Sequence, residues 1–234
     1  MSMLETIYTI PLNEKFDESA SSPENGCPFC RLHEMLDANE TDRILGAAMM
    51  EPDVRIKTNE EGFCSPHYKR MLTMKNRLAL ALMLESHLES VRRDIKDARI
   101  PIKGKGSAAL SRISRLEGSC YICSRVSSSF SAMLENAVLL WEKDKQFRAK
   151  LKSQPYLCLP HYADLLERAK HTLSKKDYSV FADDAGEVVG KYFDSISQDV
   201  SRFCKKFDYR YVDEPWGNAK DAPERAVKFL GGEE

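Results

Sequence analysis

Apolar side chains recur every three or four residues along most of the chain, which is the spacing of one face of an α-helix. The longest such run follows His67 and continues to about Arg99. Its apolar members are Met71, Met74, Leu78, Ala81, Leu88, Val91 and Ile95. The run predicts a helix over residues 65–99, which would be about 50 Å long at about 1.5 Å per residue.

The same periodicity predicts helices elsewhere in the chain. Two are expected near residues 31–50 and 124–152, and a short one near residues 223–230. A further helical run begins near Tyr162 and reaches Phe207, and the polar segment 174–177 divides it. Helices are therefore predicted over most of the chain.

Strand signals are scarce, because apolar and polar residues seldom alternate strictly. Only residues 7–12 and 207–212 look extended. Prolines and glycines predict connecting loops at residues 51–62 and 153–157, and an exposed linker at residues 100–107. The sequence thus predicts a mainly α-helical protein with minimal strand content.

The composition is typical of an ordinary globular protein, with 42% hydrophobic and 30% charged residues. No apolar run approaches the roughly 18 residues of a membrane-spanning helix. The N-terminal residues lack the basic and apolar regions of a signal peptide, so we expect a cytoplasmic protein. In a reducing cytoplasm, paired cysteines bind metal more often than they form disulfides.

Four short motifs hold six of the seven cysteines and two of the five histidines. They are Cys27-Pro-Phe-Cys30, Cys64-Ser-Pro-His67, Cys120-Tyr-Ile-Cys123 and Cys158-Leu-Pro-His161. The third motif follows the first by 93 residues (120 − 27), and the fourth follows the second by 94 (158 − 64). One inserted residue therefore relates the two pairs, which indicates an internal duplication of a module of about 90 residues.

Each copy is expected to bind one metal ion through its own two motifs. The first site is then Cys27, Cys30, Cys64 and His67, and the second is Cys120, Cys123, Cys158 and His161. The duplication also serves as an internal control, because a ligand needed by both copies should recur. The remaining histidines, His33, His87 and His171, have no histidine at the matching offset. We interpret these three as solvated or core-edge side chains.

Three thiolates and one imidazole complete a tetrahedral shell, which favours Zn²⁺ and leaves no open position for water or substrate. The sequence therefore predicts two structural Zn²⁺ ions. An iron–sulfur cluster with Cys₃His ligation is the alternative, since cysteine and histidine also bind such clusters. A thioredoxin-like role for the first motif would need a βαβ context that the pattern does not show.

The duplication and the linker define the expected organisation of the chain. Residues 1–26 form an N-terminal extended segment, 27–99 the first metal-binding helical repeat, and 100–119 a linker with a short helix. Residues 120–207 form the second repeat, and 208–234 a C-terminal tail that packs on the body. Trp216 in this tail could anchor a partner, although packing on its own chain is the simpler interpretation. Cys204 has no duplicate and is expected to be a buried apolar thiol.

Other functions find little support. The chain contains no His-Glu-x-x-His, phosphate-binding loop or Gly-x-Ser-x-Gly motif, so we expect no enzyme. Residues 92–115 carry eight Lys/Arg against two Asp, a net charge of +6. No aromatic residues interleave them and the whole chain has a net charge of −1, so we do not expect nucleic acid as a partner.

Residues 7–14, the four motifs with their flanking residues, and the tail 215–226 resemble an uncharacterised family of soluble proteins from clostridia and other anaerobic Firmicutes. The resemblance covers nearly the whole chain and implies no activity. An anaerobic host would favour the iron–sulfur alternative somewhat. We therefore expect a non-enzymatic zinc protein that acts as an adaptor or regulator through helix faces, with a protein partner or as a homodimer. A thiolate redox or metal-responsive switch is the alternative.

Overall fold

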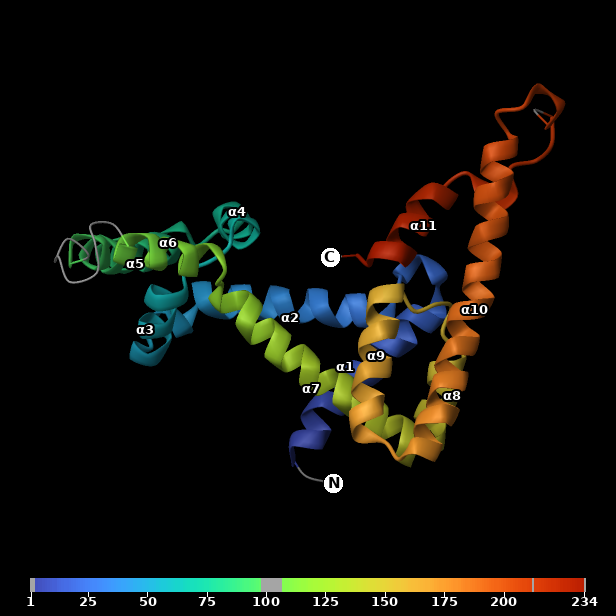
Figure 1. Cartoon of the computed structure of the whole chain (residues 1–234), viewed down its shortest axis with the longest axis horizontal. Coiled ribbons are helices and arrows are strands. Elements are labelled where there is room, and N and C mark those ends of the chain that lie inside the picture. The colour runs from blue at the N-terminus through green and yellow to red at the C-terminus, as the bar shows by residue number, and fades with distance from the viewer. Residues whose placement is uncertain (1–2, 98–106, 212, 234) are drawn as a thin grey trace. The chain divides into compact units, whose positions relative to one another are not determined.

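The computed structural model describes residues 3–97, 107–211 and 213–233. These residues form eleven α-helices and no β-strand (Figure 1), so the predicted mainly α-helical fold is confirmed. The chain divides into two compact units. Unit 1 comprises residues 1–34 and 130–234, and unit 2 comprises residues 35–129. The units do not coincide with the two sequence repeats, because unit 1 contains segments from both ends of the chain.

Unit 1 is built around the long helix α10, which contacts α8, α9 and α11 (Figure 1). Its complete helices are α1 (Met3–Ser21), α8 (Lys145–Lys152), α9 (Leu159–Thr172), α10 (Lys175–Lys205) and α11 (Ala222–Gly231). It also contains the beginning of α2 (Pro28–Leu45) and the end of α7 (Tyr121–Lys143). Short 3₁₀ turns lie at Pro23–Asn25, Tyr209–Tyr211 and Gly217–Ala219.

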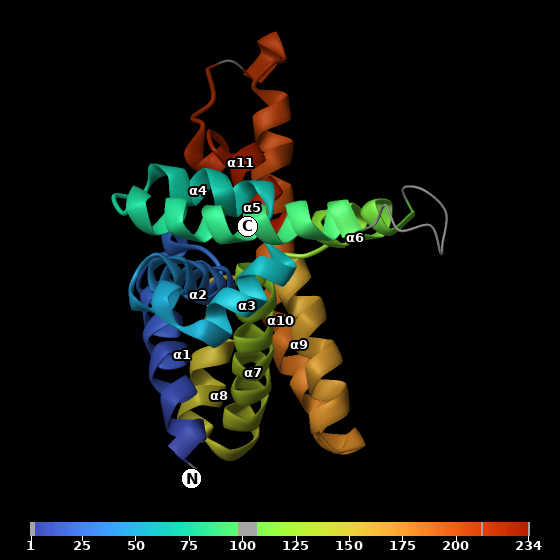
Figure 2. The same ribbon diagram turned by 90° about the vertical axis from the view of Figure 1, so that its left-hand side faces the viewer.

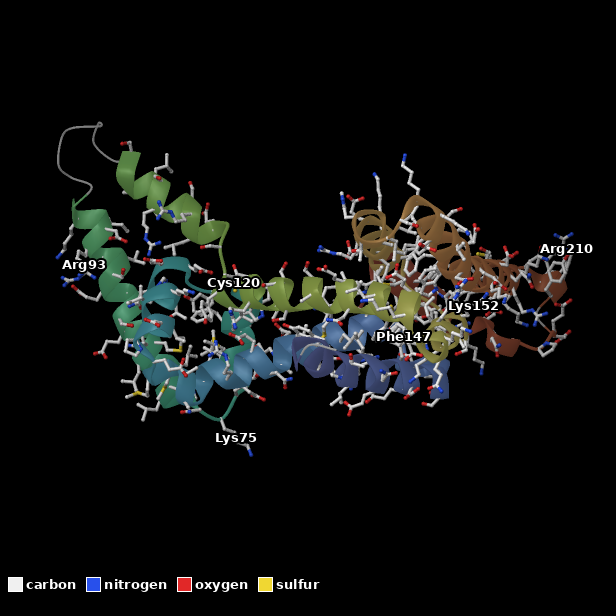
Figure 3. The ribbon with its side chains drawn as sticks, turned by 90° about the horizontal axis from the view of Figure 1, so that it is seen from below. Lys75, Arg93, Cys120, Phe147, Lys152 and Arg210 are labelled. Atoms are coloured by element: carbon white, nitrogen blue, oxygen red, sulfur yellow. The ribbon has the colours of Figure 1, made fainter. Side chains whose placement is uncertain are left out.

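Aromatic rings join the N-terminal helix to the rest of unit 1. The ring of Phe16 in α1 lies 5.3 Å from that of Phe29 in α2 and 4.9 Å from that of Phe147 in α8. All three side chains are buried. Figure 3 shows Phe147 in α8, close to α1. Burial of these large rings is a main source of stability for the unit.

The N-terminal segment was expected to be extended, and this prediction is wrong. Residues 7–12 lie within α1, which includes Pro11. Leu12, Phe16 and Ser19 are buried along one side of this helix, at helical spacing. Packing of this face against the unit therefore outweighs the local strand preference of the β-branched residues.

A buried carboxylate links three helices of unit 1. Asp184 in α10 accepts hydrogen bonds from Trp141 Nε1 (3.1 Å) in α7, and from Arg148 Nε (2.7 Å) and Lys152 Nζ (2.9 Å) in α8. Burial alone would raise the pKa of Asp184, but the hydrogen bonds from Lys152 and Arg148 outweigh it and lower this pKa. The charged carboxylate is therefore the form that the folded unit stabilises.

Unit 2 consists of shorter helices around a separate hydrophobic core. Its complete helices are α3 (Pro52–Glu61), α4 (Ser65–Thr73), α5 (Arg77–Asp97) and α6 (Ser107–Glu117), with a 3₁₀ turn at Ala47–Met50. Helix α5 contacts α3, α4 and α6, and Figure 2 shows α4, α5 and α6 lying near one another. The core includes Ile44, Val54, Phe63, Met71, Leu80, Met83, Tyr121 and Ile122.

Two predictions for this region are wrong. The expected loop at 51–62 is helix α3, which has Pro52 in its first turn and buries Val54 and Thr58. The expected continuous helix over 65–99 is broken between α4 and α5. Asn76 explains the break, because its Oδ1 accepts from the Ala79 N–H (3.2 Å) and its Nδ2 donates to the Leu45 carbonyl (2.6 Å). Asparagine thus starts a new helix.

The predicted helix over residues 124–152 is divided at Asp144, which caps the start of α8. Several other predicted elements are confirmed. Ser174 accepts from the Asp177 N–H at the start of α10, as the polar break suggested, and α11 matches the expected short helix. Residues 153–157 form a loop. Residues 209–211 are a 3₁₀ turn rather than a strand, and residue 212 and the linker residues 98–106 lie outside the described residues. Among the helices described, none is long and apolar enough to cross a membrane.

Candidate metal centres

The four cysteine motifs all occur at helix starts. Cys27, Cys64, Cys120 and Cys158 immediately precede α2, α4, α7 and α9. In each case the carbonyl of this cysteine accepts from the N–H four residues later, at 2.9 to 3.2 Å. The second ligand of each motif lies in the first helical turn, where i and i+3 share a face. The positive end of a helix favours nearby anions, so these positions stabilise thiolates.

Site B consists of Cys64, His67, Cys120 and Cys123, all in unit 2. Nδ1 of His67 lies 3.0 Å from the Cys64 Sγ and 3.3 Å from the Cys120 Sγ. It lies 3.4 Å from the Cys123 Sγ, and Cys64 and Cys123 have their Sγ atoms 3.8 Å apart. A tetrahedron with zinc bond lengths has edges of about 3.5 to 3.8 Å. Figure 3 shows Cys120 beside the start of α7.

Site A consists of Cys27, Cys30, Cys158 and His161, all in unit 1. Nδ1 of His161 lies 3.1 Å from the Cys158 Sγ and 3.4 Å from the Cys30 Sγ. The Cys27 Sγ is 3.9 Å from the same nitrogen. The Sγ atoms of Cys30 and Cys158 are 3.6 Å apart. Both sites therefore gather three sulfurs and one Nδ1 atom, and within each site the four ligand atoms lie within 4.8 Å of one another.

The grouping differs from the one predicted from the repeats. The sequence grouped Cys27 and Cys30 with Cys64 and His67, and Cys120 and Cys123 with Cys158 and His161. In the structure each Cys-x-x-Cys pair instead meets the Cys-x-x-His pair of the other repeat. The same eight residues are brought together, but in crossed pairs.

Helix length explains the crossed grouping. Helix α2 has 18 residues and carries the chain about 27 Å away from Cys27. Helix α3, with ten residues, spans only about 15 Å before the Cys-x-x-His motif begins. The second repeat has the same imbalance, with 23 residues in α7 and eight in α8. These lengths are the sequence signal that would have identified the crossed pairs.

Hydrogen bonds between the segments position the ligands of site B. The N–H of Tyr121 donates to the Gly62 carbonyl (3.0 Å), and Ser119 Oγ donates to the Glu61 carbonyl (2.6 Å). Gly62 has a φ of +63°, and an added Cβ would lie 3.1 Å from the His87 ring. A glycine is therefore needed where the chain turns toward Cys64.

A carboxylate orients the histidine of site B. Nε2 of His67 donates to Asp37 Oδ1 (2.5 Å), and Asp37 also accepts from Arg70. A carboxylate on the outer nitrogen is a common partner of a metal-binding histidine, and it fixes the tautomer that presents Nδ1 to the metal. Analysis of the repeats missed Asp37, because the residue 93 positions later is Phe130 (37 + 93).

Aromatic rings surround the histidine of site A instead. The His161 ring lies 5.1 Å from Phe130 and 6.1 Å from Phe29, measured between centroids. Phe130 is buried, and it is the neighbour of the histidine in site A, as Asp37 is in site B. The two sites thus have matching ligands in different surroundings.

The two sites also differ in exposure. All four ligands of site A are buried, whereas Cys64 is half-buried and Cys123 is exposed in site B. Gly232 lies beside site A, because a Cβ added to it would be 4.0 Å from the Cys158 Sγ and 3.9 Å from Pro160. Glu233 holds this C-terminal segment through Arg31 (2.9 Å) and Lys228 (3.4 Å).

The pKa shifts of the ligands show whether each site would favour a bound cation. In site B burial raises the pKa of Cys123, and the neighbouring Cys120 thiol raises it further. Burial would also raise the pKa of Cys120, but hydrogen bonds from His67 and from backbone N–H groups lower it to about 6. The hydrogen bond with Cys120 raises the pKa of His67 to about 10. These sulfurs cannot all be anionic without added positive charge, which a divalent ion would supply.

Site A shows the same competition among its sulfurs. Hydrogen bonds with Cys27 and then Cys30 raise the pKa of Cys158. Burial alone would raise the pKa of Cys27, but hydrogen bonds from Cys158 and Cys30 lower it well below its usual value. The sulfurs therefore shift the pKa values of one another, downward at Cys27 and upward at Cys158. The donor set of each site fits a divalent metal ion.

Residues outside the two sites have other contacts. His87 Nδ1 lies 3.1 Å from the Asn59 carbonyl, His171 pairs with Glu167 (2.9 Å), and His33 packs on Phe130. The prediction of a buried Cys204 is wrong, since this thiol is exposed. The cause is that no residue of α10 beyond Ile196 is buried.

The tail residue Trp216 packs on its own chain. Its ring lies 5.8 Å from that of Phe203, and Lys206 Nζ lies 5.4 Å from the centre of the indole. The simpler interpretation of this residue is therefore the one that the structure supports.

A family model described as "Family of unknown function (DUF6062)" matches residues 3–234. No curated protein and no solved structure matches the chain.

Proposed function

The chain belongs to this family of unknown function, and we propose from its own geometry that it is a protein with two structural zinc sites. The observation that carries the proposal is the gathering of three cysteines and one histidine, with ligand atoms within 4.8 Å of one another, in each of two sites. A Cys₃His set is a common ligand set of structural zinc.

The size of the two sites supports zinc over an iron–sulfur cluster. The Sγ–Sγ separations, 3.6 Å between Cys30 and Cys158 and 3.8 Å between Cys64 and Cys123, match edges of a tetrahedron around one ion. A cluster places several iron and sulfide atoms between its cysteines and would need wider spacing. A single iron ion would fit the same shell, so the metal must be measured.

The proposed role of each ion is to join two helix starts. In site A the ion would hold α2 to α9, and in site B it would hold α4 to α7. Four protein ligands leave no position for water or substrate, which supports a non-enzymatic role, as an adaptor or a regulatory protein. Binding of metal would contribute directly to the free energy of folding.

Elemental analysis of protein purified without oxygen tests the proposal. We expect two zinc ions per chain, no visible absorption, and a loss of helical circular dichroism when a strong chelator is added. A Cys158→Ser variant should retain about one zinc ion, and so should Cys64→Ser. A brown protein with about four or eight iron atoms per chain would overturn the assignment.

A further inference from the structure

The two sites can be compared directly, because they have the same types of ligand and differ in the exposure of these ligands to solvent. In site A the Sγ atoms of Cys30 and Cys158 lie 3.6 Å apart and both residues are buried. In site B the Sγ atoms of Cys64 and Cys123 lie 3.8 Å apart, but Cys123 is exposed and Cys64 is half-buried. The sulfur separation is nearly equal, so access to solvent distinguishes the two pairs.

We propose that the Cys64–Cys123 pair is an oxidation site, at which a peroxide forms a disulfide and releases the metal of site B while site A retains its metal. This inference rests on the proposed function, since it requires metal in both sites. Peroxides attack exposed thiolates selectively, and reversible sensor cysteines are usually exposed thiolates with a second cysteine close by. In site B the bound metal would hold the Cys123 sulfur as a thiolate.

The proposed reaction has two steps. The Cys123 thiolate attacks one oxygen of hydrogen peroxide, the O–O bond breaks, and sulfenic acid forms while hydroxide takes up a proton and leaves as water. The Cys64 thiolate then attacks the sulfenic sulfur, the S–S bond forms, and a second hydroxide is protonated. Overall, two thiolates, one peroxide and two protons give one disulfide and two waters. The sulfurs lose two electrons, which reduce the peroxide.

Geometry favours Cys64 over Cys120 as the partner. Cys64 precedes α4 and Cys123 lies in the first turn of α7, so a bridge joins two separate segments. A disulfide needs an S–S distance of about 2.05 Å, and closing the 3.8 Å gap takes a small movement of α4. Cys120 is only 5% exposed, so peroxide reaches its sulfur less readily than that of Cys123.

Site A is protected by features that are specific to unit 1. Phe29 and Phe130 flank His161, and the backbone at Gly232 lies against Cys158. The Glu233 carboxylate, fixed by Arg31 and Lys228, holds that segment in place. The burial of all three cysteines, and the position of Gly232 beside Cys158, limit the access of peroxide to these sulfurs.

The consequence of oxidation is local to unit 2. The metal of site B would lose two of its four ligands and dissociate. His67 and Cys120 would remain, but two ligands bind zinc weakly. The disulfide would then join the start of α4 to α7 in place of the metal, beside the hydrogen bond from the Tyr121 N–H to the Gly62 carbonyl (3.0 Å). A thiol reductant and zinc should restore the site.

The test uses the full-length zinc-loaded protein carrying Cys204→Ser, which removes the exposed thiol that belongs to neither site. Zinc is measured before and after treatment with hydrogen peroxide, and the disulfide is located by peptide mass spectrometry. We expect release of one of two zinc ions, a Cys64–Cys123 bridge, and recovery with reductant and zinc. A Glu233→Ala variant should release the second ion at least several-fold faster than its parent.

The zinc content before and after treatment separates failure of the proposed zinc sites from failure of the proposed oxidation site. Less than two zinc ions before treatment would contradict the proposed function itself. Two ions before treatment, with none released or with both released at the same rate, would overturn the oxidation site alone. A bridge between Cys120 and Cys123, or between Cys30 and Cys158, would also overturn it.

Discussion

At the scale of single residues, the neighbours of the ligands differ between two otherwise matching sites. Asp37 accepts from the outer nitrogen of His67, whereas Phe130 packs on His161 at the equivalent position. A carboxylate partner raises the basicity of a metal-binding imidazole and fixes its tautomer. The affinity of site B for metal should therefore depend on Asp37.

Replacing Asp37 with alanine should lower the zinc affinity of site B about 10- to 100-fold. Competition with a chromophoric chelator measures this affinity. Asp42 is an exposed carboxylate on the same helix, so Asp42→Ala is the matched control and should leave both affinities unchanged. An equal loss at both sites would contradict the role assigned to Asp37.

The fold of unit 2 requires the unusual backbone conformation of Gly62. With φ at +63° and ψ at −156°, it adopts a conformation that other residues reach only with strain. Gly62→Ala should lower the free energy of unfolding by about 1 to 3 kcal/mol, as measured by denaturant titration of the zinc-loaded protein.

Gly190 provides the opposite control. It is exposed within α10, and an added Cβ would meet no atom within 4 Å. Gly190→Ala should raise the stability by up to about 1 kcal/mol, because alanine is the better helix former. If the two variants changed stability in the same direction, the assignment of strain to Gly62 would not hold.

At the scale of elements, tertiary packing decides the structure of segments whose local pattern is ambiguous. Residues 7–12 look like a strand but are helical, because the face containing Leu12 and Phe16 is buried. Residues 51–62 look like a loop, but Pro52 starts a helix that buries Val54. Local propensity is a weak guide where burial favours another structure.

The packing of α1 can be measured with two substitutions in that helix. Phe16 is buried, and Phe16→Ala should lower the free energy of unfolding by about 3 to 5 kcal/mol. Ile10 is 58% exposed, so Ile10→Ala should change it by no more than about 0.5 kcal/mol. Similar small effects at both positions would mean that α1 does not pack on unit 1 as described.

At the scale of the whole molecule, the sequence predicts the ligands better than their grouping. The recurrence of His67 and His161 at one offset, and the absence of such a match for His33, identify all eight residues that gather in the structure. The grouping depends on helix length, and the repeats alone are equally compatible with either arrangement. The length of helix α2, which ends far from Cys27, is what indicates the crossed pairs.

Crossed pairing also explains why the units and the repeats differ. Each site takes two ligands from each repeat, so neither repeat contains a complete site. Unit 1 holds the first motif of one repeat and the last motif of the other. A duplicated sequence therefore does not imply two independently folding halves.

The crossed grouping can be measured directly in the full-length protein after zinc is replaced by ¹¹³Cd. A ¹H–¹¹³Cd correlation spectrum connects each metal to the β-protons of its cysteines. We predict that one cadmium couples to Cys27, Cys30 and Cys158, and the other to Cys64, Cys120 and Cys123. Coupling of a single cadmium to Cys27, Cys30 and Cys64 would contradict the account.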